Sequence, residues 1–269
     1  MATKVAVPAM IAVLLALSTL STAAAQGCSC APNECCSIGD AYCGTGCQDG
    51  PCTAPDTTTS SSVSVASIVT PSFFDALTAQ AADGCEAKGF YTRDAFLAAA
   101  GYYPAFGRTG SGDDSKREVA AFFAHANHET TKFCYMNEAD GPTKNYCDVA
   151  ANERWPCQEG KGYYGRGPLQ ISWNSNYGMA GQSIGFDGLG DPDAVARSAV
   201  VAFRAALWHW MDAAHEGVVS GQRFGSTIRA INGALECDGK NPGAVNNRVG
   251  YYRQFCQQFG VVPGTTLTC

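Results

Sequence analysis

The positions of fourteen cysteines divide this chain into two parts that must fold by different means. Seven of them fall between Cys28 and Cys52, among glycines, prolines and asparagines and with hardly any apolar side chains. The other seven are spread between Cys85 and Cys269. A segment such as 28–52 cannot bury a hydrophobic core of its own, so it must be stabilised by disulfide bonds.

The first 25 residues have the pattern of a secretory signal. A single charge, Lys4, precedes an apolar run from Val5 to Leu20, and small alanines end the segment at Ala25. The run is too short and too early for a membrane anchor, so we expect a secreted protein with no membrane association. Export favours disulfides over zinc for the cysteines, and segment 28–52 contains no histidine to complete a zinc knuckle.

Charge excludes one class of partner. Removing Lys4 with the signal changes the formal net charge from −6 to −7, and no basic stripe is present. Such a chain lacks the cations that pair with phosphates, so we expect no nucleic acid partner. The negative net charge does not disfavour an uncharged polymer as a partner.

The remaining chain divides at a linker. Residues 53–67 are rich in Ser and Thr and have no apolar period, which is typical of a flexible linker. From residue 68 the apolar spacing is mostly helical. We expect helices to begin at the following positions: Thr70–Pro71, Thr92, the region of Glu118, Asp191–Pro192 (one long helix continuing through Met211) and Asn241–Pro242.

The third of these helices carries a candidate catalytic carboxyl group. Val119, Phe122 and Ala126 form one apolar stripe, and Glu129 follows at the edge of that stripe. A carboxyl group against an apolar wall keeps its proton to higher pH than its unperturbed pKa of about 4.3, as a general acid requires.

A second carboxyl group, Glu138, follows nine positions later in a loop. Asp140, Gly141 and Pro142 indicate a turn just after it, so we expect Glu138 to be more open to solvent. Two carboxyl groups in unlike surroundings can hold different protonation states at one pH, which is what cleavage of glycosidic bonds uses. The alternative for both residues is a solvated surface charge.

One short segment breaks the helical pattern. From Leu169 to Asn174 apolar and polar residues alternate, which predicts a strand with Leu169, Ile171 and Trp173 on one face. The other face would present amide and hydroxyl groups suited to sugar hydroxyls or a water. A metal hydrolase is a competing hypothesis, because His125, His128 and Glu129 lie within five residues, but the order is not His-Glu-x-x-His and no third ligand is evident.

Five separated segments resemble family 19 glycoside hydrolases, the plant-type endochitinases. They are CEAKGFYTRDAFLAAAGYYPAFG from Cys85, HETT from His128, YYGRGPLQISWNSNYG from Tyr163, VAFRAALWHWM from Val201 and INGALEC from Ile231. The resemblance covers about residues 69–269 and implies a mainly α, lysozyme-like catalytic domain at 68–269 with a short β element. The short separation of the two glutamates is similar to class IV chitinases and implies a shortened cleft.

The resemblance also implies roles for individual residues. Glu129 resembles the general acid, Glu138 the general base, and Ser172 the residue that helps to hold the attacking water. Glu236 and Arg248 resemble a charge network that steadies the base, Glu138. The family inverts configuration, so the two carboxyl groups should lie on the order of 6.5–9.5 Å apart. Residues that match substrate contacts are Tyr164, Gln170, Ser172, Asn176, Asn232 and Arg248.

The cysteine-rich segment 26–52 resembles a hevein-like chitin-binding module. CSCAPNECCS and DAYCGTGCQDGPC match, but the aromatic-rich stretch with a further cysteine between them is missing. Tyr42 and Ser37 alone make a poor stacking platform, so we expect weak or no chitin binding by this module. The pairs implied are Cys28–Cys36, Cys35–Cys43 and Cys47–Cys52, which leaves Cys30 over.

In the catalytic domain the resemblance implies the pairs Cys85–Cys134, Cys147–Cys157 and Cys237–Cys269. Cys256 is then a free thiol on the inner stripe of the last helix. The chain departs from the family at His209, where an aromatic residue is usual, and at Ser175, which also replaces an aromatic residue. We interpret His209 as a buried, hydrogen-bonded core histidine.

Together these observations predict a secreted, monomeric, inverting endochitinase that acts on chitin and chitooligosaccharides in plant defence, without metal or cofactor. The alternative is a catalytically weak, lectin-like chitin-binding protein. No extension follows Cys269, which favours the apoplast over the vacuole as destination.

Overall fold

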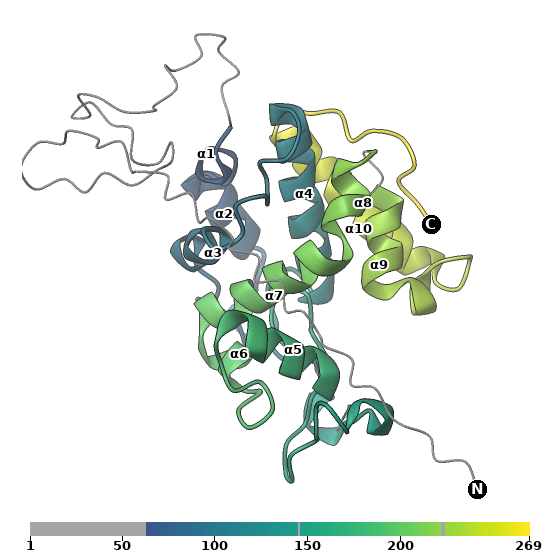
Figure 1. Ribbon diagram of the computed structural model, residues 1–269. Helices are drawn as coiled ribbons and strands as arrows, with labels where there is room; N and C mark the ends of the chain where they lie inside the picture. The colour runs from purple at the N-terminus through teal and green to yellow at the C-terminus, as the bar shows by residue number, and fades with distance from the viewer. Residues whose placement is uncertain (1–62, 145, 222–223) are drawn as a thin grey trace, which may run out of the picture. The chain divides into compact units, whose positions relative to one another are not determined.

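The computed structural model describes residues 63–144, 146–221 and 224–269 (Figure 1). The chain divides into two compact units, 1–60 and 61–269, and the description applies to the second. The predicted signal peptide, the cysteine-rich module with its three expected disulfides and Cys30, and most of the linker lie outside the described residues.

The described part is mainly α-helical, as the sequence predicts, and contains isolated β-bridges rather than named strands. In chain order its helices are α1 (Val65–Ile68), α2 (Pro71–Thr78), α3 (Arg93–Ala100), α4 (Gly112–Glu129), the 3-10 helices η2 (Gly141–Thr143) and η3 (Val149–Ala151), α5 (Asn174–Ile184), α6 (Ala194–Arg197), α7 (Ala199–Ala213), α8 (His215–Val219), α9 (Phe224–Glu236) and α10 (Pro242–Gln258).

Side-chain caps explain where several helices begin. Thr70, Thr92 and Asn241 each accept a hydrogen bond from a backbone N–H of the first turn, and a proline follows Thr70 and Asn241. These three helix starts confirm the sequence prediction. α4 begins at a capping box of Ser111 and Asp114, several residues before its apolar stripe.

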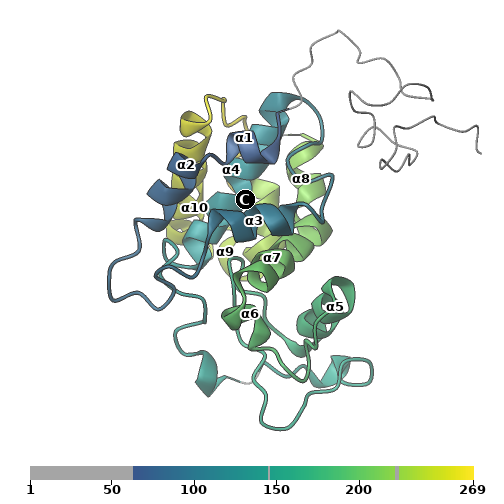
Figure 2. The ribbon, with the colours of Figure 1, turned by 90° about the vertical axis from the view of Figure 1, so that its left-hand side faces the viewer.

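α4 is the buried centre of the domain. All its side chains from Val119 to Ala126 lie in the core, α10 packs along it, and α3 packs on α7 (Figure 2). The ring of Phe96 lies against Phe122, Phe123 and Phe203, with centroids between 4.8 and 5.9 Å apart. This packing fixes the direction of α4 and therefore the position of its last residue, Glu129.

The prediction of one continuous helix from Asp191–Pro192 is wrong. The chain forms two helices, α6 and α7, because Ser198 between them has extended backbone angles (φ −126°, ψ 113°). The Ser198 hydroxyl accepts the N–H of Val201 and so caps α7. Val195 and Phe203 are still buried on the predicted face.

The strand predicted at Leu169–Asn174 is also wrong. Gln170 (φ 47°) and Trp173 (φ 77°) have left-handed backbone angles, and helix α5 begins at Asn174. Leu169 and Ile171 are buried as expected, but Trp173 is 44 % exposed. Asn174 is buried instead, because its side chain accepts the N–H of Asp148 and donates to the carbonyl group of Trp155.

The expected linker extends too far into the folded part. The backbone N–H of Ser67 donates to the Ser64 hydroxyl, which caps α1, and Val65 and Ile68 are buried in the core. Arg93 donates to the carbonyl oxygens of Ala66 and Val69 and ties this segment to α3.

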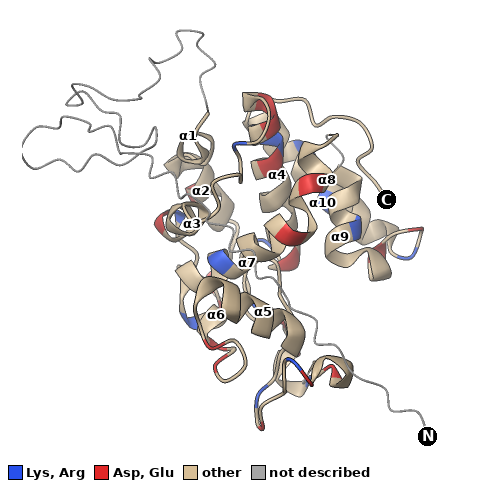
Figure 3. Ribbon diagram, in the orientation of Figure 1, with Lys and Arg blue, Asp and Glu red and all other residues tan. Residues whose placement is uncertain are grey.

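Three disulfides join Cys85 to Cys134, Cys147 to Cys157 and Cys237 to Cys269, the pairs that the resemblance implies. Cys256 is a buried free cysteine. Among the described residues, no helix has the length and apolar character needed to cross a membrane. Lys and Arg positions in this part of the chain are dispersed among acidic ones (Figure 3).

Candidate active site

Glu129 is the last residue of α4, and its side chain is 17 % exposed. Arg248 on α10 donates a hydrogen bond of 2.5 Å from Nη2 to Oε1 of Glu129. Burial raises the pKa of Glu129, and the positive charge of Arg248 only partly offsets this effect. Burial therefore favours the protonated form of Glu129 more than it would be favoured in a freely solvated glutamate.

The same guanidinium also binds a second carboxylate. Arg248 is fully buried and donates from Nε and Nη2 to the two oxygens of Glu236, at 2.8 and 2.7 Å. Asn232 donates to Glu236 Oε1 at 2.7 Å from a kink inside α9, where its backbone leaves helical angles. Burial acts to raise the pKa of Glu236, but the hydrogen bonds and charge of Arg248 lower it overall.

The resemblance implied that Arg248 and Glu236 steady Glu138, and this expectation is wrong, because Arg248 binds Glu129 and Glu236 instead. Both side chains belong to the environment of Glu129. The reason is the packing of α10 along α4, which directs Arg248 toward the end of α4.

His125 completes this network in a defined protonation state. Because Arg248 Nη1 donates to Nδ1 of His125 (3.0 Å), Nε2 carries the hydrogen and donates to the Thr227 hydroxyl (2.8 Å). Thr227 in turn donates to the carbonyl oxygen of Phe224. Burial and the charge of Arg248 hold the pKa of His125 well below its ordinary value.

This geometry contradicts the zinc hypothesis. Both ring nitrogens of His125 are engaged by protein groups, so neither is free to bind a metal ion. Burial and the charge of Arg248 also lower the pKa of His128, to about 4. Within the described ranges, no three His, Cys, Asp or Glu side chains are grouped as metal ligands.

Glu138 lies in the loop after α4, and its side chain is 24 % exposed. Its Oε1 accepts hydrogen bonds from Lys144 Nζ (2.6 Å) and the Tyr146 hydroxyl (2.8 Å), and Oε2 accepts the N–H of Gly165 (3.1 Å). Burial acts to raise the pKa of Glu138, but these three hydrogen bonds lower it overall. The carboxyl group is therefore held in its ionised form.

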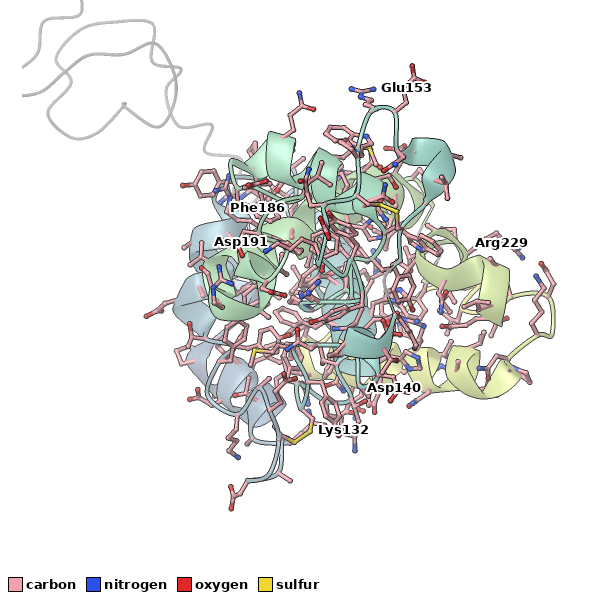
Figure 4. The ribbon with its side chains drawn as sticks, turned by 90° about the horizontal axis from the view of Figure 1, so that it is seen from below. Lys132, Asp140, Glu153, Phe186, Asp191 and Arg229 are labelled. Carbon is pink, nitrogen blue, oxygen red and sulfur yellow. A yellow bond between two sulfur atoms is a disulfide. The ribbon has the colours of Figure 1, made fainter. Side chains whose placement is uncertain are left out.

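The loop between the two glutamates is fixed at several points. Thr131, Lys132 and Phe133 turn the chain with φ between 51° and 62°, and the Cys85–Cys134 disulfide follows at once. The N–H of Glu138 then donates to the carbonyl oxygen of Gly165 (2.8 Å). Lys132, inside this loop, and Asp140, two residues after Glu138, are labelled in the view from below (Figure 4).

Two of the predicted substrate contacts, Tyr164 and Gln170, lie next to Gly165, whose N–H binds Glu138. The Tyr164 ring stacks on the Arg166 guanidinium (3.6 Å), and Gln170 donates to the carbonyl oxygen of Gly167 (2.9 Å). The side chain of Asn176 donates to the backbone carbonyl of Ser172 (2.8 Å) at the start of α5. Asn232 belongs instead to the Glu129 network.

Sequence reasoning missed Lys144 and Tyr146, which bind Glu138. The turn signal at Gly141–Pro142 was available, and it returns the chain toward Glu138. It also missed the exposure of Trp173, whose ring meets Tyr146 edge to face at 5.0 Å. The departure at Ser175 is half-buried in α5.

His209 does not lie in the deep core. Its side chain is half-buried beside Trp208, with ring centroids 6.2 Å apart, and burial lowers the pKa of His209.

Two carboxyl groups in unlike environments on a helical domain are the arrangement that glycoside hydrolases use. The family described as chitinase class I, glycoside hydrolase family 19, matches residues 68–221 and 215–269. The chain belongs to this family.

Similar proteins include several plant chitinases. "Chitinase 6" of Oryza sativa subsp. japonica is 75 % identical over 223 residues, which cover 83 % of this chain and 81 % of the relative. "Endochitinase B" of Zea mays is 58 % identical over 255 residues, 92 % of this chain and 89 % of the relative. A crystal structure of a family 19, class IV chitinase from Zea mays is 56 % identical, with a TM-score of 0.71. It covers 75 % of this chain and 98 % of the solved chain.

Proposed function

We propose that the protein is a secreted endochitinase of class IV that hydrolyses β-1,4 bonds between N-acetylglucosamine units with inversion. Glu129 is the general acid and Glu138 the general base. One observation carries this proposal: the pKa of Glu129 is raised by burial, while that of Glu138 is lowered by its hydrogen-bond donors. Between these two pKa values one group is protonated and the other ionised, as inverting hydrolysis requires.

In this mechanism Glu129 protonates the oxygen of the leaving sugar. The hydrogen bond from Arg248 fixes Oε1, which leaves Oε2 to carry the acidic hydrogen. After proton transfer the guanidinium stabilises the carboxylate that forms, so Arg248 favours the product state of this step.

Glu138 accepts a proton from the water that attacks the anomeric carbon on the opposite face. Ser172 helps to hold that water. We expect the two carboxyl groups to stand on the order of 6.5–9.5 Å apart, which leaves room for water and sugar.

The substrate contacts proposed are Tyr164, Gln170, Asn176 and Asn232, whose phenol and amide groups suit sugar hydroxyl and acetamide groups. The names of the relatives support chitin and chitooligosaccharides as substrates. The dispersed charges of the described part suit an uncharged polymer.

The domain organisation proposed is a signal peptide at 1–25, a truncated hevein-like module at 26–52, a linker and a catalytic domain to residue 269. The protein then acts in the apoplast as a monomer in defence against fungi. Retention of residues 26–55 on chitin beads measures whether the truncated module contributes binding; we expect little retention.

A chitohexaose digest with analysis of the anomers tests the proposed reaction. The intact chain should release products with inverted configuration. Glu129→Gln should abolish hydrolysis, and Glu138→Gln should lower it by about 10²–10⁴-fold while folding persists. A lectin-like protein would bind chitohexaose without cleaving it, and that outcome would overturn the proposal.

A further inference from the structure

Lys144 binds Glu138, the predicted base, directly. Its ammonium group lies 2.6 Å from Oε1 of Glu138, although its side chain is 44 % exposed. No role was expected for this residue from the sequence, and nothing in the proposed mechanism requires a cation there.

The turn between the two residues directs Lys144 back toward Glu138. The N–H of Gly141 donates to the carbonyl oxygen of Glu138, and the N–H of Lys144 donates to that of Gly141. Gly141 also rests on the Tyr164 ring so closely that a Cβ atom there would lie 2.3 Å from Cδ2 of Tyr164. The turn is thus held by a fixed surface, and Lys144 extends from a backbone of defined direction.

Tyr146 donates to the same carboxylate oxygen and has its own support. Its ring meets Trp173 edge to face, with centroids 5.0 Å apart. Its carbonyl oxygen accepts the N–H of Asn174 (3.3 Å), the first residue of α5. The orientation of Glu138 is therefore set by three donors from different segments, Lys144, Tyr146 and Gly165.

We propose that Lys144 is a positioning residue for the reaction, which holds Glu138 ionised and turns one free oxygen lone pair toward the attacking water. This inference rests on the proposed function of Glu138. A carboxylate has roughly four acceptor positions. Lys144, Tyr146 and Gly165 occupy three of them, so about one position is left for the water.

The charged groups around Glu138 determine in which direction removal of Lys144 shifts the pKa of Glu138. Lys144 is the cation that faces Glu138, the Tyr146 hydroxyl is neutral, and Asp140 acts on Lys144 from the same turn. A cation favours the ionised form of a carboxyl group, so removing it raises the pKa of Glu138. Since the base must be ionised to act, the acid limb of the pH profile then moves to higher pH.

The test compares the pH dependence of kcat/KM for the intact protein, Lys144→Met and Lys144→Arg on chitohexaose. We expect Lys144→Met to move the acid limb to higher pH and to lower kcat by about 10-fold, less than loss of the base itself. Lys144→Arg should restore the position of the limb, because it keeps the charge. The basic limb, which reports Glu129, should stay in place in both variants.

Lys88→Met is the matched control. Lys88 is equally exposed, at 44 %, and its ammonium group pairs with Asp83 and the carbonyl oxygen of Ala81. This variant should leave both limbs unchanged. An unmoved acid limb in Lys144→Met would overturn the inference, provided that Glu138→Gln shows its expected loss of activity. If Glu138→Gln is fully active, the assignment of the base fails instead, whatever Lys144 does.

Discussion

Arg248 and Glu129 are joined by a hydrogen bond of 2.5 Å between two helices that lie more than 100 residues apart in the sequence. Arg248 also holds Glu236, so one buried cation is shared between two carboxyl groups. Because Arg248 also pairs with Glu236, its positive charge lowers the pKa of Glu129 less than it would if it paired with Glu129 alone. The protonation of Glu129 therefore depends on Glu236, which acts through Arg248 and through its own negative charge.

Glu236→Gln tests this dependence. The negative charge of Glu236 acts to raise the pKa of Glu129, so its removal leaves Arg248 to pair with Glu129 alone and the pKa of Glu129 falls. Because the acid must be protonated, the basic limb of the pH profile of kcat/KM should move to lower pH. Glu153→Gln, an exposed substitution (Figure 4), serves as control. A basic limb that stays in place would contradict the shared-cation interpretation.

Gly141→Ala should damage the turn beneath Glu138. The added Cβ would meet three atoms of the Tyr164 ring at 2.3–2.8 Å, so the turn or the ring must shift. A displacement near 1 Å at a catalytic group costs about 10²-fold in rate. We expect a large fall in kcat, measured on chitohexaose, with the fold retained by circular dichroism. Gly84→Ala, where nothing lies within 4 Å, should keep full activity.

His215→Gln should remove a pH-dependent part of the stability. His215 lies 2.5 Å from Oε1 of the fully buried Glu118, which also accepts the indole N–H of Trp210. The hydrogen bond to Glu118 raises the pKa of His215 above its ordinary value of 6.5. Its stabilisation is therefore fully present below about pH 6.5 and is lost as the pH rises through the folded-state pKa.

The measurement is urea unfolding of the intact protein and His215→Gln from pH 5 to 9. The stability difference between them should shrink toward high pH. A difference that is constant with pH would show that the ionisation of His215 does not contribute. Thr109→Ser, which keeps a half-buried hydroxyl group that donates to the carbonyl oxygen of Ala105, provides a variant that should follow the intact protein at every pH.

Removing the Cys85–Cys134 disulfide by a double substitution to serine should destabilise the protein by about 2–5 kcal/mol. The disulfide anchors the chain at Cys134, between Glu129 and Glu138, so activity should fall at temperatures where the fold survives. Thermal unfolding and a parallel rate measurement distinguish the two effects. A loss of stability with an unchanged rate below the transition would mean that the loop holds Glu138 without this crosslink.

The sequence by itself predicts those features that depend on neighbouring residues. Thr70, Thr92 and Asn241 mark helix starts because a cap needs only the N–H groups of the next turn. The apolar stripe from Val119 to Ala126 predicts the buried face of α4 and the half-buried place of Glu129 for the same reason. The alternation at 169–174 led to a wrong strand prediction, because Gln170 and Trp173 have left-handed angles and the N–H groups of Trp173 and Asn174 donate to the carbonyl oxygens of Tyr163 and Tyr146.

Only the tertiary structure decides which partners the two glutamates have. A long side chain such as Arg248 can reach either carboxyl group in principle, and the packing of α10 along α4 selects Glu129. Likewise Lys144 reaches Glu138 because Tyr164 supports the turn between them. The directions of both pKa shifts follow from burial and from charges brought together by folding, which no local pattern of residues contains.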